Sequence, residues 1–317
     1  MGCAVSRRTP LATHAVCTVA PLKGDKEVVT AAPPSTVSPS ASSSRDPSSE
    51  AECSRLEPAL APRPLTEDER QVAWQLANYF DASSDHESPI ALWILGPSSV
   101  GKSTLTTELG CSFDIPMQHS GKDVGAHLDA VIIDGEFMRE AHDVWRSWVR
   151  TDDWRSAYPA LKLTINTEKD SLEDAAVARR KHLVIPQTML NLSKGLSDVA
   201  RLTSKGYTNH VLAIVAPLED CRRRGLAREV KTGKRYQPLE FERSISAIPA
   251  MVSASNGCYK LIRAIEENDT LNQHLGHRVL AVGQCGNSCK AEDPNIPTPN
   301  FSAGDLTDVL VNNIGVA

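Results

Sequence analysis

The stretch Gly96-Pro-Ser-Ser-Val-Gly-Lys-Ser-Thr104 decides the fold of this chain. It matches the pattern GxxxxGK[ST] of a phosphate-binding P-loop. The six residues before it, 90–95, are all apolar and are bounded by Pro89 and Gly96, which is typical of a buried parallel strand. A helical pattern follows the motif. The motif therefore lies between a strand and a helix, which is the context that a P-loop requires.

The residue types of the loop indicate how it binds phosphate. Glycines let backbone N–H groups turn toward phosphate oxygens, and the helix that begins near Lys102 adds its positive dipole end. Lys102 is predicted to neutralise the β- and γ-phosphates of ATP, and Ser103 to offer its hydroxyl to Mg²⁺. Thr104 is predicted to contact the α-phosphate. The predicted cofactors are ATP and Mg²⁺, and the predicted ATP-binding residues are Gly96, Ser98, Ser99, Val100, Gly101, Lys102, Ser103 and Thr104.

Further strands and helices alternate along the middle of the chain. Strands are predicted at 128–133, 183–185 and 211–215, with helices near 103–109, 136–149, 170–181 and 189–204. This alternation predicts an α/β fold, a three-layer α/β/α sandwich around a parallel sheet of about five strands. Residues 222–230 and 243–267 are also predicted to be helical.

The composition divides the chain into three parts. Residues 1–65 are rich in Ser, Pro and Ala and lack apolar periodicity, so they are predicted to be a disordered tail. Order is predicted to begin at Thr66, a helix N-cap after which Val72, Leu76 and Phe80 recur at helical spacing. The kinase-like domain is predicted to span 66–267, followed by a loosely ordered C-terminal extension over 268–317.

The N-terminus carries a second motif. Gly2 follows Met1 and Ser6 lies four residues later, which fits the template for N-myristoylation, and Cys3 is placed for palmitoylation. Two acyl chains would hold the protein at a membrane surface, on its cytoplasmic face; without them the protein is expected in the cytoplasm. The alternative is an ordinary disordered start. No segment approaches the ~20 consecutive apolar residues of a membrane-spanning helix.

Charge and cysteine content limit the classes of function. The net charge of −5 gives no overall attraction to nucleic acid, and no DNA partner is expected. Eight scattered cysteines fit a reducing compartment better than a disulfide scaffold. The string nearest to the Asn-Lys-x-Asp signature of GTPases, at 166–170, has the wrong spacing and context.

Acidic residues follow the second predicted strand. Residues 131–133 lead into Asp134, Glu136 and Arg139, and the carboxyl ends of parallel strands line the active crevice of such folds. One carboxylate there could accept the proton of an acceptor hydroxyl, while the other holds Mg²⁺. Arg139 lies on the same helix face as Glu136 and could bind the acceptor. The alternative is a helix N-terminus that carries acids because its dipole favours them.

A basic cluster follows the last predicted strand. Between residues 222 and 235 lie Arg222, Arg223, Arg224, Arg228, Lys231, Lys234 and Arg235. Arginine forks match phosphate oxygens, so the segment is interpreted as a lid over the P-loop. A solvated helix face and a patch for RNA or acidic lipid are the two alternatives.

These segments together resemble the zeta-toxin-type kinases. Asp134-Gly-Glu-x-x-Arg139-x-x-His142 is similar to their Asp-x-Asp-x-x-Arg-x-x-His segment, and 182–188 parallels their strand ending in Glu-Gly-Thr. The resemblance covers residues 68–265. It implies transfer of the ATP γ-phosphate to a hydroxyl, in bacterial members that of UDP-N-acetylglucosamine.

The resemblance also implies residue roles. Glu136 takes the place of the family's general-base Asp. Arg228 and Arg235 take the places of two arginines that clamp the transferring phosphate, and Thr188 takes the place of a threonine that contacts the acceptor. Pro186 replaces an acceptor-contacting glutamate, so the sugar-nucleotide acceptor does not carry over directly. Two alternatives to a small-molecule kinase stay open: a nucleotide-binding membrane switch or scaffold, and a polynucleotide 5′-hydroxyl kinase.

Overall fold

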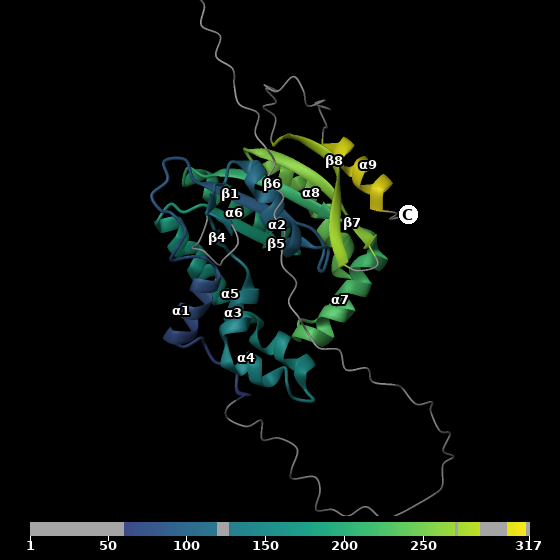
Figure 1. Cartoon of the computed structure of the whole chain (residues 1–317). Helices are drawn as coiled ribbons and strands as arrows, with labels where there is room; N and C mark the ends of the chain where they lie inside the picture. Colours follow the sequence, from purple (N-terminus) through teal and green to yellow (C-terminus); the bar gives the residue numbers. More distant parts are fainter. Residues whose placement is uncertain (1–59, 119–126, 270–271, 286–302, 315–317) are drawn as a thin grey trace, which may run out of the picture. The chain divides into compact units, whose positions relative to one another are not determined.

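The computed structural model describes residues 60–118, 127–269, 272–285 and 303–314. The central feature is a mostly parallel six-stranded sheet in the order β4-β5-β1-β6-β7-β8 (Figure 1). The strands are β1 (Ile90–Leu95), β4 (Val131–Ile132), β5 (Leu183–Gln187), β6 (Thr208–Val215), β7 (Cys258–Asp269) and β8 (Asn272–Gln284). Neighbouring strands from β4 to β7 pair in parallel, and β7 and β8 form an antiparallel pair. The predicted fold class is confirmed.

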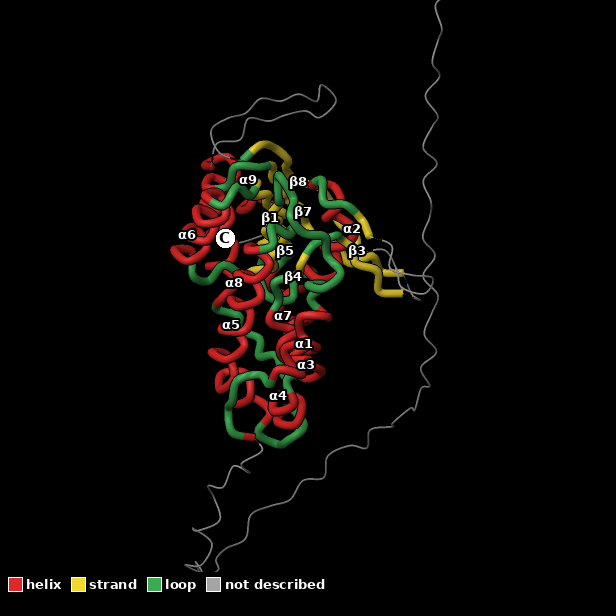
Figure 2. The backbone as a smooth tube through the Cα atoms, turned by 90° about the vertical axis from the view of Figure 1, so that its left-hand side faces the viewer, coloured by secondary structure: helices red, strands yellow, loops and turns green. Residues whose placement is uncertain are grey.

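Helices cover both faces of this sheet. They are α1 (Glu67–Leu76), α2 (Lys102–Gly110), α3 (Gly135–Ala141), α4 (Asp143–Trp148), α5 (Trp154–Ala178), α6 (Leu192–Ser204), α7 (Leu218–Thr232), α8 (Glu240–Ala254) and α9 (Ala303–Ile314). In the side view of Figure 2, α6, α8 and α9 lie on one side of the sheet and α2 lies on the other. Strand β1 is buried at each of its residues, so the P-loop that follows it begins from the middle of the core.

A small second sheet lies beside α2. It pairs β2 (Met117–Gln118) with β3 (His127–Leu128), and the 3₁₀ helix η2 (Cys111–Phe113) precedes it. Leu128 is predicted to belong to a strand of the central sheet, but it belongs to this small sheet, whereas β4 begins only at Val131. The central-sheet strand is short because only Val131 and Ile132 find pairing partners on β5.

The sequence prediction is wrong for the end of the domain. Residues 258–267 were expected to continue a helix but form most of β7, and the predicted domain boundary at 267 falls inside this strand. The apolar residues at 259, 261, 262 and 264 fit both the period of a helix and the period of a strand. Pairing with both β6 and β8 makes this segment a strand. The extension predicted to be loosely ordered also contributes β8 and α9 to the fold.

Helix α1 packs through its smallest residues. Ala73 and the following Ala77 are fully buried, whereas Val72, Leu76 and Phe80 are exposed. The alanine face lets α1 approach α3 closely, and the larger apolar side chains then have no place in that contact. The expected N-cap at Thr66 is confirmed, because its hydroxyl accepts a hydrogen bond from Glu69 N in a capping box.

The buried carboxylate of Glu69 joins α1 to the start of α4. It accepts hydrogen bonds from Arg63 Nη1 at 2.6 Å, Thr66 N at 2.7 Å and Asp143 N at 2.8 Å. The His142 ring lies beside it and contacts Arg63 O through Nε2. Burial by itself would raise the pKa of Glu69, but the hydrogen bonds from Arg63 and the backbone outweigh it and hold that pKa well below its usual range.

Glu69→Gln is expected to lower the free energy of unfolding by about 2 kcal/mol at neutral pH, because it removes a charge-assisted network around a half-exposed arginine. Since folding lowers the pKa of Glu69, its contribution is complete above the unfolded-state pKa and disappears as the pH falls toward the folded-state value. Chemical denaturation between about pH 3 and 7 measures this. Glu67→Gln is the control, because Glu67 is 81% exposed. Equal stability of the two variants at neutral pH would contradict the assignment.

Candidate active site

The loop at 96–104 connects β1 to α2 through three positive φ angles, two of them at glycines and one at Ser99. Gly96 has a φ of +145°, and a Cβ atom at this position would lie 2.1 Å from Ile214 O of the neighbouring strand β6. Gly101, the N-cap residue of α2, has a φ of +105°. Both positions therefore require glycine, and together they turn the loop backbone around the N-terminus of α2.

Lys102 is the residue of the loop whose pKa is shifted. Its Nζ donates hydrogen bonds to Gly96 O at 2.7 Å and Pro97 O at 2.8 Å, so the side chain lies across the loop. Burial, followed by repulsion from Lys234, lowers the pKa of Lys102 to about 7. A group with these neighbours gains its charge readily when an anion arrives.

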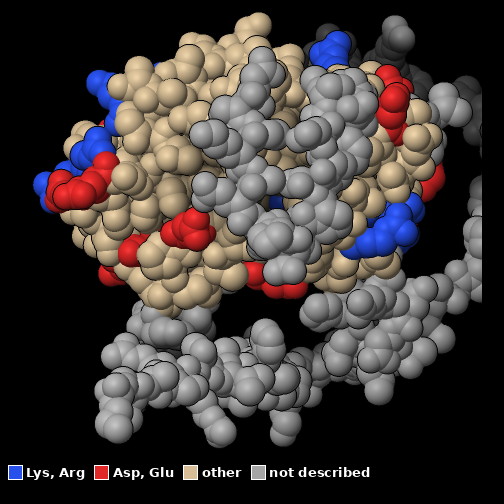
Figure 3. Space-filling view, turned by 90° about the horizontal axis from the view of Figure 1, so that it is seen from above, with Lys and Arg blue, Asp and Glu red and all other residues tan. Residues whose placement is uncertain are grey.

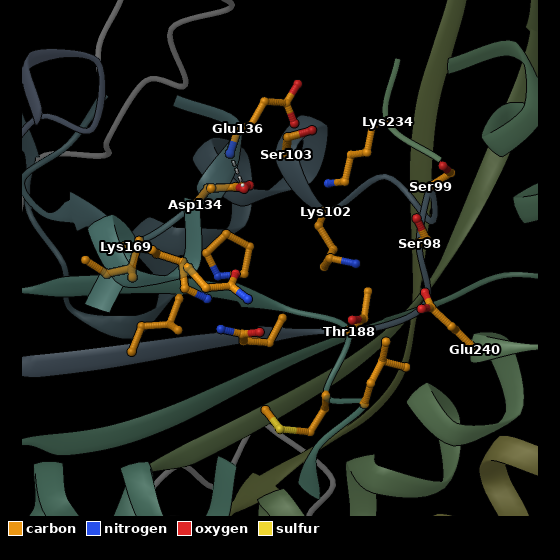
Figure 4. A pocket seen from close by; sticks show the side chains of 18 of the residues that line it. Ser98, Ser99, Lys102, Ser103, Asp134, Glu136, Lys169, Thr188, Lys234 and Glu240 are labelled. Carbon is orange, nitrogen blue, oxygen red and sulfur yellow. Dashed lines mark hydrogen bonds between the residues drawn. The ribbon is translucent and has the colours of Figure 1, made fainter. Parts of the chain in front are cut away.

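The two predicted carboxylates occupy different environments. Asp134 is the N-cap of α3, where its Oδ1 accepts a hydrogen bond from Glu136 N at 2.9 Å. Burial opposes the charge of Asp134, but Lys234 and Arg139 outweigh it and lower its pKa. Glu136 is exposed on the first turn of the same helix. Figure 4 shows Asp134 and Glu136 on the side of the site that faces Ser103.

Arg139 lies one helical turn after Glu136 and is buried. Its guanidinium carbon lies 5.6 Å from the centre of the Trp145 ring and 5.8 Å from that of Tyr158. Its Nη2 atom has no hydrogen-bond partner among the described residues. The two rings thus hold a cation at the cavity wall with unused donor capacity.

Helix α7 brings the basic cluster to the loop. Arg228 Nη2 donates to Ser98 Oγ at 2.8 Å, and Arg224 Nε donates to Ser99 O at 2.9 Å. Burial lowers the pKa of Arg228, a shift that attraction to Glu136 opposes. Arg235, predicted as the second clamp, also lines the cavity but is exposed. These contacts place α7 against the P-loop, and the interpretation of the segment as a lid stays a prediction.

Lys234 is a candidate site residue that the sequence analysis placed only within the basic cluster. Helix α7 ends at Gly233, which has a φ of +71°, and the chain then turns so that Lys234 lines the cavity. Burial, followed by repulsion from Arg139, lowers the pKa of Lys234 to about 8. In Figure 4 Lys234 and Lys102 extend into the same space as Asp134 and Ser103. The glycine that ends the helix is the signal that could have identified Lys234.

The main cavity has a volume of about 680 Å³ and extends well beyond the loop. From the end of β5 it is lined by Pro186, Gln187 and Thr188. Beyond these residues it continues between facing polar side chains of α5, α6 and the loop before α6: Tyr158, Lys162, Asn166, Lys169, Asp170, Glu173, Asn191, Lys194 and Asp198. The cavity therefore has room for a second molecule next to a bound nucleotide.

The residues at the loop fit a nucleotide with its metal ion. Buried donors with unused capacity, Arg139 Nη2 and Arg228 Nε, lie around the site and suit phosphate oxygens. Within the described part of the chain, no group of three or more His, Cys, Asp or Glu side chains could hold a metal alone. Ser103 and Asp134, however, suit Mg²⁺, which is usually held by one or two protein oxygens together with phosphates.

The sequence-predicted residues are largely brought together. Ser98, Ser99, Gly101, Lys102, Ser103, Thr104, Asp134, Glu136, Arg139, Thr188, Arg228 and Arg235 all line the main cavity. Gly96 and Val100 do not line it; Gly96 shapes the turn, and Val100 is fully buried beneath the loop. His182 is packed in the core, where its Nδ1 accepts a hydrogen bond from Ile90 N.

A mostly parallel sheet with a P-loop after its central strand β1, and with carboxylates after β4, defines a P-loop phosphotransferase-like protein. The family model described as zeta toxin matches residues 76–273. The chain therefore belongs to the zeta toxin family, whose members are ATP-using, kinase-like phosphotransferases. The resemblance inferred from the motifs is confirmed.

One solved structure supports the fold, and two further structures are similar to this chain. A chain from the PezAT chromosomal toxin–antitoxin system of Streptococcus pneumoniae is similar with a TM-score of 0.54 and 15% identity, covering 80% of this chain and 90% of that one. The AvrRxo1-ORF1:AvrRxo1-ORF2 complex with sulphate ions is similar with a TM-score of 0.46 and 18% identity, over 78% and 77%. The AvrRxo1-ORF1:-ORF2 complex with ATP is similar with a TM-score of 0.43 and 16% identity, covering 68% of this chain and 64% of that one. No curated protein sequence matches the chain.

The described residues do not test the predictions about membrane attachment. None of the helices in the described residues is both long and apolar enough to cross a membrane. Gly2 and Cys3, the predicted acylation sites, and almost all of the predicted tail lie outside the described residues. Attachment to a membrane stays a prediction.

Nucleotide binding is expected to take up protons near neutral pH. Lys102 has a lowered pKa of about 7 without ligand, and phosphate next to it favours the charged form, so affinity for ATP should fall as the pH rises above about 7. Calorimetric titration at about pH 8 in buffers of different ionisation enthalpy measures the uptake. Lys102→Arg, whose charge does not titrate in this range, should bind ATP with a smaller uptake. Equal uptake by both proteins would contradict this role of Lys102.

Proposed function

We propose that this chain is an ATP-dependent kinase that transfers the γ-phosphate to a hydroxyl group of a small acceptor. The observation that carries the proposal is the continuity of the main cavity, from the loop at Lys102 past Asp134 and Glu136 to Thr188. A protein that only binds and hydrolyses a nucleotide has no need of the space beyond the phosphates. A kinase needs it for its second substrate.

The proposed mechanism uses the two carboxylates differently. Asp134 lies among cations that stabilise its charged form, which makes it a weak base and a suitable holder of Mg²⁺. Glu136 is exposed at the same edge and accepts the proton of the acceptor hydroxyl as its oxygen bonds to the phosphorus and ADP departs. This assignment favours Glu136 over Asp134 as the base.

The cations stabilise the charge that develops during transfer. Lys102 and Arg228 lie on the loop side, where Arg228 is held by Ser98, and Arg139 lies on the acceptor side. Arg235, at the rim, is proposed to close on the phosphates as the second clamp. Bound ATP supplies the phosphoryl group, and bound Mg²⁺ draws charge from its oxygens.

The proposed acceptor site lies between Thr188 and the facing surfaces of α5 and α6. Hydroxyl, amide, lysine and carboxylate side chains line this part, which suits a polar, hydrogen-bonding molecule such as a sugar nucleotide. Pro186 lines this part, where the family has a glutamate, and the neighbouring Gln187 offers an amide instead. UDP-N-acetylglucosamine is therefore one candidate among several.

The polynucleotide-kinase alternative has less support. On the face seen in Figure 3, the visible described residues show Lys and Arg in small groups at the rim, with Asp and Glu along the same rim. A nucleic-acid end would be better served by a continuous basic surface. The basic residues of α7 instead contact the P-loop itself.

Turnover of ATP by the full chain with Mg²⁺ and a panel of acceptors tests the proposal. The panel holds UDP-N-acetylglucosamine, other sugar nucleotides and 5′-hydroxyl oligonucleotides. Phosphorylated product is expected, with kcat reduced about 100-fold or more in Lys102→Ala and Glu136→Gln. Lys205→Ala, at the exposed end of α6, is the control. ATP binding that depends on Lys102, without acceleration by any acceptor, would instead support the nucleotide-switch alternative.

We further propose acylation at Gly2 and Cys3 as the means of membrane attachment. The support is the sequence motif alone, since these residues lie outside the described part. In cells, the wild-type chain should incorporate myristate and palmitate and sediment with membranes. Gly2→Ala should lose both labels, and Cys3→Ser should lose only palmitate. Sedimentation of Gly2→Ala that equals wild type would contradict acyl anchoring.

A further inference from the structure

A second cavity, of about 340 Å³, adjoins the main one between α3, α4 and the end of α7. Glu136, Arg139 and Lys234 line both cavities, so these three side chains form the wall between them. The second cavity therefore begins where the proposed base lies, and neither Thr188 nor a residue of α5 lines it. None of the roles assigned above uses this space.

The charges around the second cavity are predominantly positive. Four cationic side chains line it against two carboxylates: Arg139, Arg146, Arg150 and Lys234 against Glu136 and Glu140. Arg146 pairs with Asp143 of its own helix. Arg150 forms no ion pair with any residue that the structure describes. Arginines gathered around a cavity of this size suit a phosphate group, which accepts bidentate hydrogen bonds.

Arg139 lines both cavities, so its unused donor capacity is available to a ligand of the second cavity as well as to the transferring phosphate. Its side chain is only 8% exposed, and its Nη2 atom lacks a hydrogen-bond partner among the described residues. Contacts with Trp145 and Tyr158 fix the guanidinium at the wall that the two cavities share. A buried charged donor without an acceptor is costly, and an anion in the cavity would supply the acceptor.

We propose that the second cavity binds a phosphate group of the acceptor while the hydroxyl to be phosphorylated lies beside Glu136. This inference rests on the proposed kinase function. Because Glu136 lies in the shared wall, the hydroxyl and the phosphate must be near each other in the same molecule. The acceptor class is then a phosphorylated polyol, either a sugar phosphate or a nucleoside phosphate. No covalent change occurs in the second cavity.

The charges explain why this acceptor could bind next to ATP. The shared wall carries Arg139 and Lys234, whose positive charges face Glu136 in the wall and Asp134 in the main cavity. Burial and the neighbouring Arg139 already lower the pKa of Lys234 to about 8. A second anion on the far side of this wall would therefore relieve repulsion among the cations. An uncharged acceptor would leave the repulsion in place.

The test compares paired acceptors with and without phosphate. The pairs are sugars with their sugar phosphates, and nucleosides with their monophosphates, each assayed with Mg²⁺ and ATP. The phosphorylated member is expected to have a KM at least tenfold lower. In the double variant Arg146→Gln/Arg150→Gln, the KM for the phosphorylated acceptor should rise, so that the preference disappears. The KM for ATP, and kcat with a saturating acceptor, should stay close to wild type.

The matched control is Arg222→Gln on α7. Its side chain is 58% exposed, compared with 51% for Arg146, and each arginine pairs with an acid three residues earlier in its helix. Arg222 lines neither cavity. The control should keep the preference for phosphorylated acceptors, and unchanged thermal unfolding of all variants shows that the fold is intact. Retention of the preference in the double variant would overturn the proposal, as would no preference in the wild-type chain.

A binding measurement separates failure of this site from failure of the kinase function. Inorganic phosphate is titrated into the chain with its P-loop saturated by a non-hydrolysable ATP analogue and Mg²⁺. Binding that weakens at least tenfold in the double variant, but not in Arg222→Gln, supports the anion site even if no acceptor of the panel is phosphorylated. Absence of binding, or equal binding by all variants, overturns it. The chain could also bind phosphate and phosphorylate acceptors without any preference for the phosphorylated ones. That result assigns the cavity to free phosphate and overturns the proposal.

Discussion

The structure depends on positive charge gathered at the end of the central strand. Lys102, Lys234, Arg139 and Arg228 surround one space, and burial with mutual repulsion lowers the pKa values of the two lysines and of Arg228. Asp134 and Glu136 oppose them there. Such a set is costly without an anion and favourable with one, so it is suited to polyphosphate through relief of the repulsion as well as through hydrogen bonds.

Helix α3 connects this charged site to the core of the protein. Its first turn holds Asp134 and Glu136, its buried face holds Arg139, and it ends at His142, which lies against Glu69 of α1. The alanine face of α1 packs on α3, so the acidic edge of the site stands on a helix that is held from both ends. The position of the carboxylates relative to the loop is consequently a property of the core.

The sequence predicted the central elements because their signals are local. The run 90–95 followed by two glycines and a lysine can form a P-loop only between a strand and a helix, and the alternating elements up to Val215 repeat the same pattern. Prediction failed at β7, where the apolar spacing fits two periods, and at β8, which is stabilised mainly by its partner strand. It also began α5 too late, because Pro159 lies inside that helix and weakens its local signal.

The sequence by itself determined the P-loop, the parallel α/β fold, the family and the residues of the cavity closest to the P-loop. These follow from glycine conformations, apolar runs and motif order, which are encoded over short distances. Only the tertiary structure decided that Lys234 and Lys102 line the same cavity, that Nη2 of the buried Arg139 has no hydrogen-bond partner among the described residues, and that a second cavity adjoins Glu136. The reason is physical: burial and electrostatic coupling arise between α3, α4 and α7, whose contacts no local pattern records.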